Sequence, residues 1–164
     1  MAVDIDLSQF REIFYEESME RLEAMESGLL NLDIGTPDSE AINTIFRNAH
    51  SIKGGAGTFG FSEISDFTHV VETLFNEVRD RKRAVTKVLV DIMLESVDCI
   101  RYMITQSKAG GPVDAARVTS LKERLASLPR EEQIKTGWRI HFQPHEHMLK
   151  TGNDPYRILR ELEA

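Results

Sequence analysis

Apolar residues recur every three to four positions along five stretches of this 164-residue chain, and this spacing constrains the fold more than any other feature. The period matches the turn of an amphipathic α-helix, which has one apolar face to bury. Because short connections make sequential helices antiparallel neighbours, the pattern predicts an all-α protein, an up-down four-helix bundle with a fifth helix attached. The five stripes are Phe10, Ile13, Phe14, Leu22, Met25, Leu29 and Leu30; Ile42, Ile45, Ala49, Ile52 and Ala56; Phe67, Val70, Val71, Leu74, Phe75 and Val78; Leu89, Ile92, Met93, Val97, Ile100 and Ile104; and Val118, Leu121, Leu125 and Leu128.

Short polar residues stand before each stripe, as expected for helix N-caps. The predicted N-caps are Asp6 (with Gln9 as a capping box), Thr36 (with Pro37 at the first helical position), Ser62, Thr86 and Asp114. Glycine favours the left-handed conformation that ends a helix, so Gly60 is the predicted end of the second helix.

The C-terminal segment has a different pattern. Residues 138–143 alternate apolar and polar side chains, which predicts a strand, and Asp154-Pro155 precedes a predicted short helix over residues 156–163. One strand and one helix cannot bury themselves alone. We therefore expect a bundle over residues 5–130, a linker over 131–136, and over 137–164 the truncated beginning of a following domain or an interdomain segment, in a fragment of a longer protein.

Charge and composition exclude several classes of function. The net charge of −7 argues against non-specific nucleic-acid binding. No apolar run approaches the ~20 residues of a membrane span, so direct membrane insertion is not expected. The N-terminus lacks the features of a secretory signal. Cys99 is the single cysteine, which excludes an internal disulfide and fits a cytoplasmic protein.

The stretch AHSIKGGAGTFG (residues 49–60) places four glycines after a histidine, inside a predicted helix. Residues 55–60 formally match G-x-G-x-x-G, but a dinucleotide site needs a strand before the glycines, and a P-loop needs Gly-Lys-Ser/Thr after them. Nucleotide binding is therefore disfavoured. Ending a helix requires fewer glycines than this stretch contains.

A helical wheel places His50, Lys53, Gly54 and Gly57 on one face, turned away from the apolar stripe. A face without side chains around a histidine lets a large partner bring its own active site up to the imidazole. The plainer alternative is a solvated surface histidine, which is the common case for an exposed polar residue.

Glu72 on the third predicted helix points away from that helix's apolar stripe, with His69 and Asn76 near it on the same side. In an antiparallel pair of helices, Glu72 can reach His50. A carboxylate that accepts the Nδ1–H fixes the tautomer of the imidazole and leaves Nε2 as a free nucleophile. The alternative for Glu72 is an ordinary solvated position.

Residues 46–60, FRNAHSIKGGAGTFG, closely resemble the phosphorylation-site helix of the histidine phosphotransfer (HPt) domain in CheA-type chemotaxis kinases, and residues 68–72, THVVE, resemble its second motif. The resemblance covers roughly residues 5–130. It implies that His50 is the phosphoacceptor, that Glu72 orients and polarises it, and that Lys53 and His69 complete the polar network. The resemblance also implies that Gly54 lies where the partner protein passes close to this helix.

The resemblance further implies a function in two-component signalling. His50 would accept the γ-phosphoryl group of ATP from a separate kinase domain of the same or a partner protomer, and pass it to an aspartate of a response-regulator receiver domain. ATP and magnesium would bind the kinase domain. For this chain itself we expect no cofactor, no metal and no independent catalysis.

Three alternatives stay open. A stand-alone HPt shuttle would transfer phosphoryl groups between receivers, although the truncated segment after residue 137 argues against it. A helical metal-binding bundle would use His50, His69 and carboxylates, but the repeated Glu-x-x-His motif of such bundles is absent, and His145 with His147 is a weak pair of ligands. A structural interaction module would leave the accessible histidine unexplained.

Overall fold

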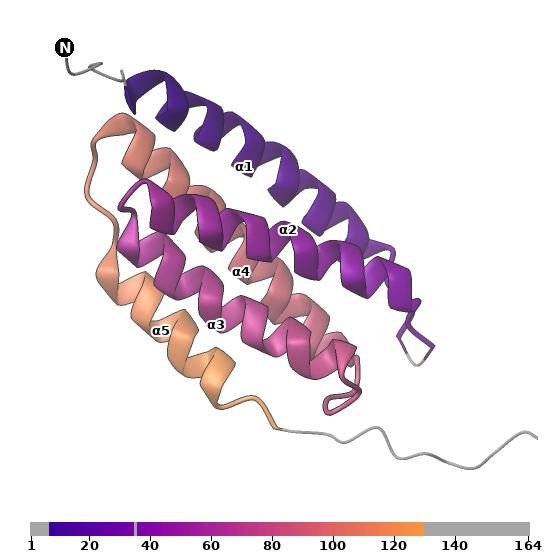
Figure 1. Cartoon of the computed structure of the whole chain (residues 1–164). Helices are drawn as coiled ribbons and strands as arrows, with labels where there is room; N and C mark the ends of the chain where they lie inside the picture. Colours follow the sequence, from indigo (N-terminus) through magenta and orange to yellow (C-terminus); the bar gives the residue numbers. More distant parts are fainter. Residues whose placement is uncertain (1–6, 35, 130–164) are drawn as a thin grey trace, which may run out of the picture. The chain divides into compact units, whose positions relative to one another are not determined.

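The computed structural model describes residues 7–34 and 36–129, and this part of the chain is built from helices without a strand (Figure 1). The helices are α1 (Leu7–Leu30), α2 (Ser39–Thr58), α3 (Ser62–Arg79), α4 (Lys87–Ala109) and α5 (Ala115–Ala126). The predicted all-α bundle with a fifth helix is confirmed. The linker, the predicted strand over 138–143 and the predicted helix over 156–163 lie outside the described residues.

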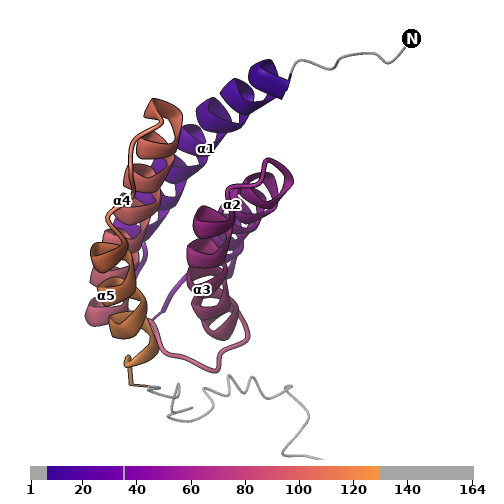
Figure 2. The same ribbon diagram turned by 90° about the vertical axis from the view of Figure 1, so that its left-hand side faces the viewer.

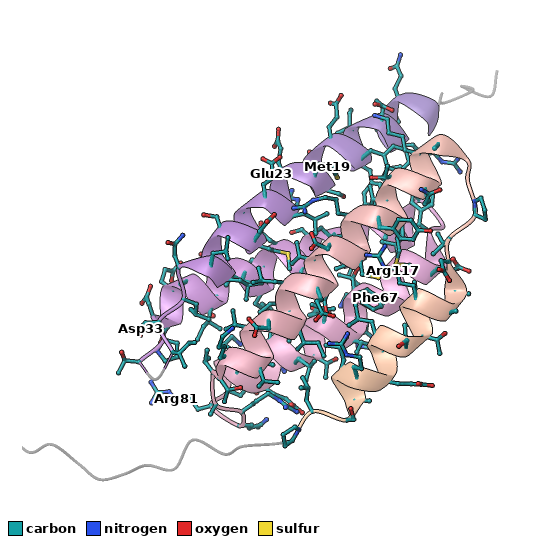
Figure 3. The ribbon with its side chains drawn as sticks, turned by 180° about the vertical axis from the view of Figure 1, so that it is seen from behind. Met19, Glu23, Asp33, Phe67, Arg81 and Arg117 are labelled. Carbon is teal, nitrogen blue, oxygen red and sulfur yellow. The ribbon has the colours of Figure 1, made fainter. Side chains whose placement is uncertain are left out.

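Figure 2 shows α2 beside α3 and α1 beside α4, and α1 contacts both α2 and α4. The α2–α3 pair shares the most extensive contact, α1 also packs on α2, and α5 packs on α3 and α4. Phe67 of α3 is fully buried; in Figure 3 it is labelled in the view from behind, where α4 and α5 run across the front.

The apolar stripe of α2 is buried throughout, as predicted, and those of α3, α4 and α5 are buried except for the partly buried Val70 and Leu128. The prediction was wrong for three residues of α1, because Phe10 and Ile13 are half exposed and Leu30 is 66% exposed. Ile13 lies nine residues before the buried Leu22, roughly two and a half turns, so it falls on the opposite side of the helix.

Two of the predicted N-caps are confirmed. The Thr86 hydroxyl accepts a hydrogen bond from the backbone N–H of Leu89 at 3.2 Å, and the Asp114 carboxylate accepts from two backbone N–H groups at the start of α5. The predicted capping box of Asp6 with Gln9 involves a residue outside the described part of the chain.

The predicted caps of α2 and α3 were wrong. Asp38, not Thr36, caps α2, because its carboxylate accepts from the backbone N–H groups of Glu40 and Ala41 while the Thr36 hydroxyl donates to an aspartate in the preceding loop. Pro37 accordingly precedes the helix. Ser62 is the first helical residue of α3, which has no side-chain cap.

Gly60 ends α2, as predicted. Its φ of +78° lies in the left-handed region, and the backbone N–H of Phe61 donates to Ala56 while that of Gly60 donates to Gly57. These two hydrogen bonds form a Schellman motif, which closes the helix and reverses the chain. The turn therefore fixes how α3 returns along α2.

Two adjacent glycines of α2 have opposite surroundings. A Cβ at Gly55 would lie 2.7 Å from Cδ2 of Phe14 on α1, so the close approach of these helices requires glycine there. A Cβ at Gly54 would meet nothing within 4 Å. Gly54 thus weakens the helix without a packing reason.

Alanine substitutions should separate these glycines. Gly54→Ala should raise the free energy of unfolding by about 1 kcal/mol through helix propensity. Gly55→Ala should lower the free energy of unfolding, since overpacking against the buried Phe14 ring costs about 1–3 kcal/mol. This cost outweighs the gain in helix propensity, which is the same as at Gly54. Urea denaturation followed by circular dichroism measures both; a Gly55→Ala protein as stable as Gly54→Ala would contradict the close packing on Phe14.

Candidate functional site

The site lies on the α2–α3 pair, where an exposed histidine meets a buried carboxylate. Nδ1 of His50 on α2 lies 2.6 Å from Oε1 of Glu72 on α3. The His50 side chain is 62% exposed, whereas Glu72 as a residue is only 7% exposed. The predicted contact between them is present, and the alternative of a solvated Glu72 is wrong. Packing of α3 against α2 encloses this carboxylate.

The second oxygen of Glu72 is also paired. Nζ of Lys53 lies 2.5 Å from Oε2, and its side chain is 28% exposed. His50 and Lys53 are three residues apart and therefore lie on the same face of α2, one turn apart. The carboxylate thus bridges two residues of one helix face, and the structure brings together three of the four predicted catalytic residues.

Electrostatics determine the state of this carboxyl group. Burial by itself would raise the pKa of Glu72. The hydrogen bond and positive charge of Lys53 outweigh burial, together with the hydrogen bond of His50, and the pKa of Glu72 lies below its ordinary value. Glu72 is therefore an ionised carboxylate at neutral pH. An ionised carboxylate only accepts hydrogen bonds, so Nδ1 of His50 is the donor and the neutral imidazole keeps its lone pair on Nε2.

The fourth predicted residue, His69, is not part of this network. It is exposed on α3, and within residues 7–34 and 36–129 its side chain forms no hydrogen bond or ion pair; only its backbone carbonyl accepts, from Thr73. Asn76 lies one turn beyond Glu72 on α3 and accepts a hydrogen bond from Arg79.

The two glycines predicted to provide access differ. Both are exposed, and Gly54 borders open space, so the surface one turn beyond His50 carries no side chain at that position. A Cβ at Gly57 would lie 3.6 Å from the Ser65 hydroxyl of α3, an ordinary van der Waals contact. Gly54 is thus the position at which the surface beside the histidine is open.

Sequence reasoning missed two residues beside the histidine. The Phe46 ring stacks with the His50 imidazole, with centroids 6.1 Å apart and planes inclined by 25°. The Arg79 guanidinium carbon lies 4.2 Å from the Phe46 ring centroid. The spacing of four residues between Phe46 and His50 was an available signal for the first contact. No sequence signal connects Arg79 to Phe46, because the contact crosses between helices.

The described residues contain no group of three histidine, cysteine, aspartate or glutamate side chains arranged to hold a metal ion. None of the helices in this part of the chain is long and apolar enough to cross a membrane. His145 and His147 lie outside the described residues.

Comparison with known proteins places these features in a family. The family model described as Hpt domain matches residues 9–110. The chain is 39% identical over 128 residues to the chemotaxis protein CheA of Rhizobium meliloti, covering 78% of this chain and 17% of that protein. It is 37% identical over 134 residues to CheA of Salmonella typhimurium, covering 82% and 20%. The chain spans about a fifth of the length of these relatives.

Solved structures agree with this likeness. The phosphorylated P1 domain of CheA3 from R. sphaeroides, in complex with CheY6, superposes with a TM-score of 0.65 at 25% identity, covering 73% of this chain and 94% of that chain. The solution structure of a histidine phosphotransfer domain of CheA gives a TM-score of 0.65 at 28% identity, covering 77% and 98%.

The lowered pKa of Glu72 predicts a pH-dependent stability. Because the folded-state pKa lies below the ordinary value of 4.5, the carboxylate stabilises the fold above about pH 4.5, and this contribution is lost as the pH falls further. At pH 7, Glu72→Gln should lower the free energy of unfolding by about 1–3 kcal/mol, because it removes the negative charge and replaces one of the two acceptor oxygens, which face His50 and Lys53, with an NH2 donor. The difference from wild type should shrink below pH 4.5.

Glu17→Gln is the matched control, since Glu17 forms an exposed ion pair with Arg21 on α1. Its effect at pH 7 should stay within about 0.5 kcal/mol. Denaturation curves at pH 7 and pH 3.5 measure all three proteins. A Glu72→Gln penalty that is the same at both pH values would contradict the ionised carboxylate.

Proposed function

This chain belongs to the Hpt domain family and is a phosphotransfer domain of the CheA type, and from this premise we propose that His50 is its phosphoacceptor. The observation that carries the proposal is the state of the imidazole. Its Nδ1 is held by the ionised Glu72 carboxylate, and the ring is exposed beside the open surface at Gly54. This arrangement presents a nucleophilic Nε2 to a large partner.

The phosphoryl donor in this proposal is ATP, bound with magnesium by a separate kinase domain of the same or a partner protomer. The Nε2 lone pair attacks the γ-phosphorus, the Nε2–P bond forms, and the bond from phosphorus to the bridging oxygen breaks, so that ADP leaves with the electron pair. The Nδ1 proton stays on the ring, where the Glu72 carboxylate balances the positive charge that develops. The kinase domain supplies the metal and most of the positioning.

Two further residues have proposed roles. The Lys53 ammonium group keeps Glu72 ionised and adds positive charge on the face that receives the phosphoryl group, since it lies one turn from His50. His69 is proposed as an additional polar group on the neighbouring helix. Its exposed position supports contact with the transferred group or with the partner.

The second step of the proposal returns His50 to its starting state. An aspartate oxygen of a response-regulator receiver attacks the phosphorus, the N–P bond breaks, and the electron pair returns to Nε2. The related P1 domain of CheA3 in complex with CheY6 supports a receiver as the partner. Cytoplasmic localisation is part of this proposal, because ATP and the receivers of such signalling systems are cytoplasmic.

Phosphorylation of His50 can be tested directly. The purified chain is incubated with ATP, magnesium and a CheA-type kinase core that lacks its own phosphotransfer domain, and acid-labile, base-stable phosphate is counted. The wild type should be labelled only when the core is present, and His50→Gln should reduce the label to background. His69→Gln serves as a second histidine variant that should still be labelled. Full labelling of His50→Gln would overturn the assignment.

Gly54 should matter for access and not for the chemistry of the imidazole. Gly54→Leu should leave the bundle folded but slow phosphorylation by the kinase core by about tenfold or more, since the added side chain keeps the donor from its productive distance. Gly54→Ala, which adds a single carbon, should have a smaller effect. Labelling by phosphoramidate, a small donor, should be equal in all three proteins. An unchanged rate of Gly54→Leu with the core would show that the donor approaches from elsewhere.

A further inference from the structure

A second contact on the imidazole has no role in the mechanism above. The Phe46 ring lies one turn before His50 on α2 and stacks with its imidazole, with 6.1 Å between centroids and 25° between planes. Phe46 is partly buried and packs against the hydrophobic core. The Phe46 ring is therefore held in place beside the exposed His50 imidazole.

Arg79, in the last turn of α3, holds Phe46 from the neighbouring helix. Its guanidinium carbon lies 4.2 Å from the phenyl centroid, a cation–π distance. The guanidinium is itself anchored, because it donates to the Asn76 side chain and Nε lies 3.7 Å from Oδ1 of Asp80. The hydrophobic core and the Arg79 guanidinium of α3 therefore both restrict the phenyl ring of Phe46.

The hydrogen bond to Glu72 fixes one atom of the imidazole but leaves the plane of the ring free to turn about that bond. Stacking on Phe46 restricts the plane. With Nδ1 and the plane both restricted, the direction of the Nε2 lone pair is set before a donor arrives, which is the condition for rapid group transfer. Because the His50 side chain is 62% exposed, few other contacts restrict the plane of its ring.

We propose that Phe46, held by Arg79, is a positioning residue that fixes the plane of the His50 imidazole and closes one side of the site. The other side, one turn after His50, is the open surface at Gly54. The phosphoryl donor and the receiver therefore both approach over Gly54. This inference rests on the proposed role of His50 as the phosphoacceptor, and it adds a residue to that site.

Kinetics with the kinase core test the positioning role through two variants of Phe46. Phe46→Leu keeps an apolar side chain but removes the flat ring, so kcat should fall by about tenfold while KM for this domain stays the same. Phe46→Tyr keeps the ring and should restore most of the rate. Melting curves establish that both proteins are folded.

Variants of Arg79 test the support of the ring while Phe46 is present. Arg79→Gln should lower kcat in the same direction by a smaller factor, and Arg79→Lys, which keeps a cation, should recover part of the loss. Arg47→Gln is the matched charge control, because Arg47 is exposed and pairs with Glu40 on the same helix. Its kcat and KM should equal those of the wild type.

Proton NMR of the His50 ring supplies a readout that a purely structural role would not move. The ring current of Phe46 shifts the imidazole C–H signals in the wild type. In Arg79→Gln these signals should move toward their positions in Phe46→Leu, while the Nδ1–H tautomer is kept in every variant because Glu72 is intact.

Several outcomes would overturn the inference. An unchanged kcat in Phe46→Leu would contradict the positioning role. A rise in KM alone would make Phe46 a docking residue instead. A Phe46→Tyr protein as slow as Phe46→Leu would show that the ring itself is not what matters. Should Phe46→Leu fail to fold, the Arg79→Gln and Arg79→Lys kinetics decide, because both variants keep Phe46: an Arg79→Gln protein with the kcat of the wild type would overturn the inference. Failure of the underlying function is distinct, because wild type would then be unlabelled or His50→Gln would be labelled.

Discussion

The buried carboxylate of Glu72 is the group on which the site depends. A carboxylate taken out of water is costly unless it is paired and hydrogen-bonded, and both of its partners, His50 and Lys53, come from one face of α2. The packing of α3 on α2 that encloses Glu72 therefore also assembles the site. The hydrogen bond between Glu72 and His50 also holds the imidazole proton on Nδ1, so the packing of this helix pair and the proposed nucleophilicity of Nε2 have a common physical cause.

The register of the α2–α3 hairpin aligns these partners. The Schellman turn reverses the chain around Phe61, and His50 and Glu72 each lie eleven residues from that position. On the other side of α2, Gly55 lets Phe14 of α1 approach closely, which turns the histidine face away from the bundle. Its neighbour Gly54 has no packing partner and leaves the surface beside the histidine open. Two adjacent glycines in one helix thus serve packing and access separately.

The arrangement is that of a carrier whose chemistry is completed by partners. The imidazole is exposed and oriented, but the ATP and magnesium of the proposed reaction belong to a separate kinase domain, and the receiver supplies the second acceptor. In the proposed reaction a single histidine meets two different large partners. A side chain that extended over the imidazole would hinder both partners. Phe46 and Arg79 contact the site on one side only, where they restrict the ring and leave the approach over Gly54 open.

The sequence by itself determined the helices, most of the core and the candidate histidine, because helical periodicity and the glycine-rich motif are local patterns. It also indicated that Glu72 can reach His50. Only the tertiary structure decided that Glu72 is buried, that Arg79 touches Phe46 and that Ile13 faces away from the core. The physical reason is that periodicity defines the faces of one helix, whereas burial and contacts between helices depend on the rotation and separation of neighbouring helices, which packing of the whole bundle sets.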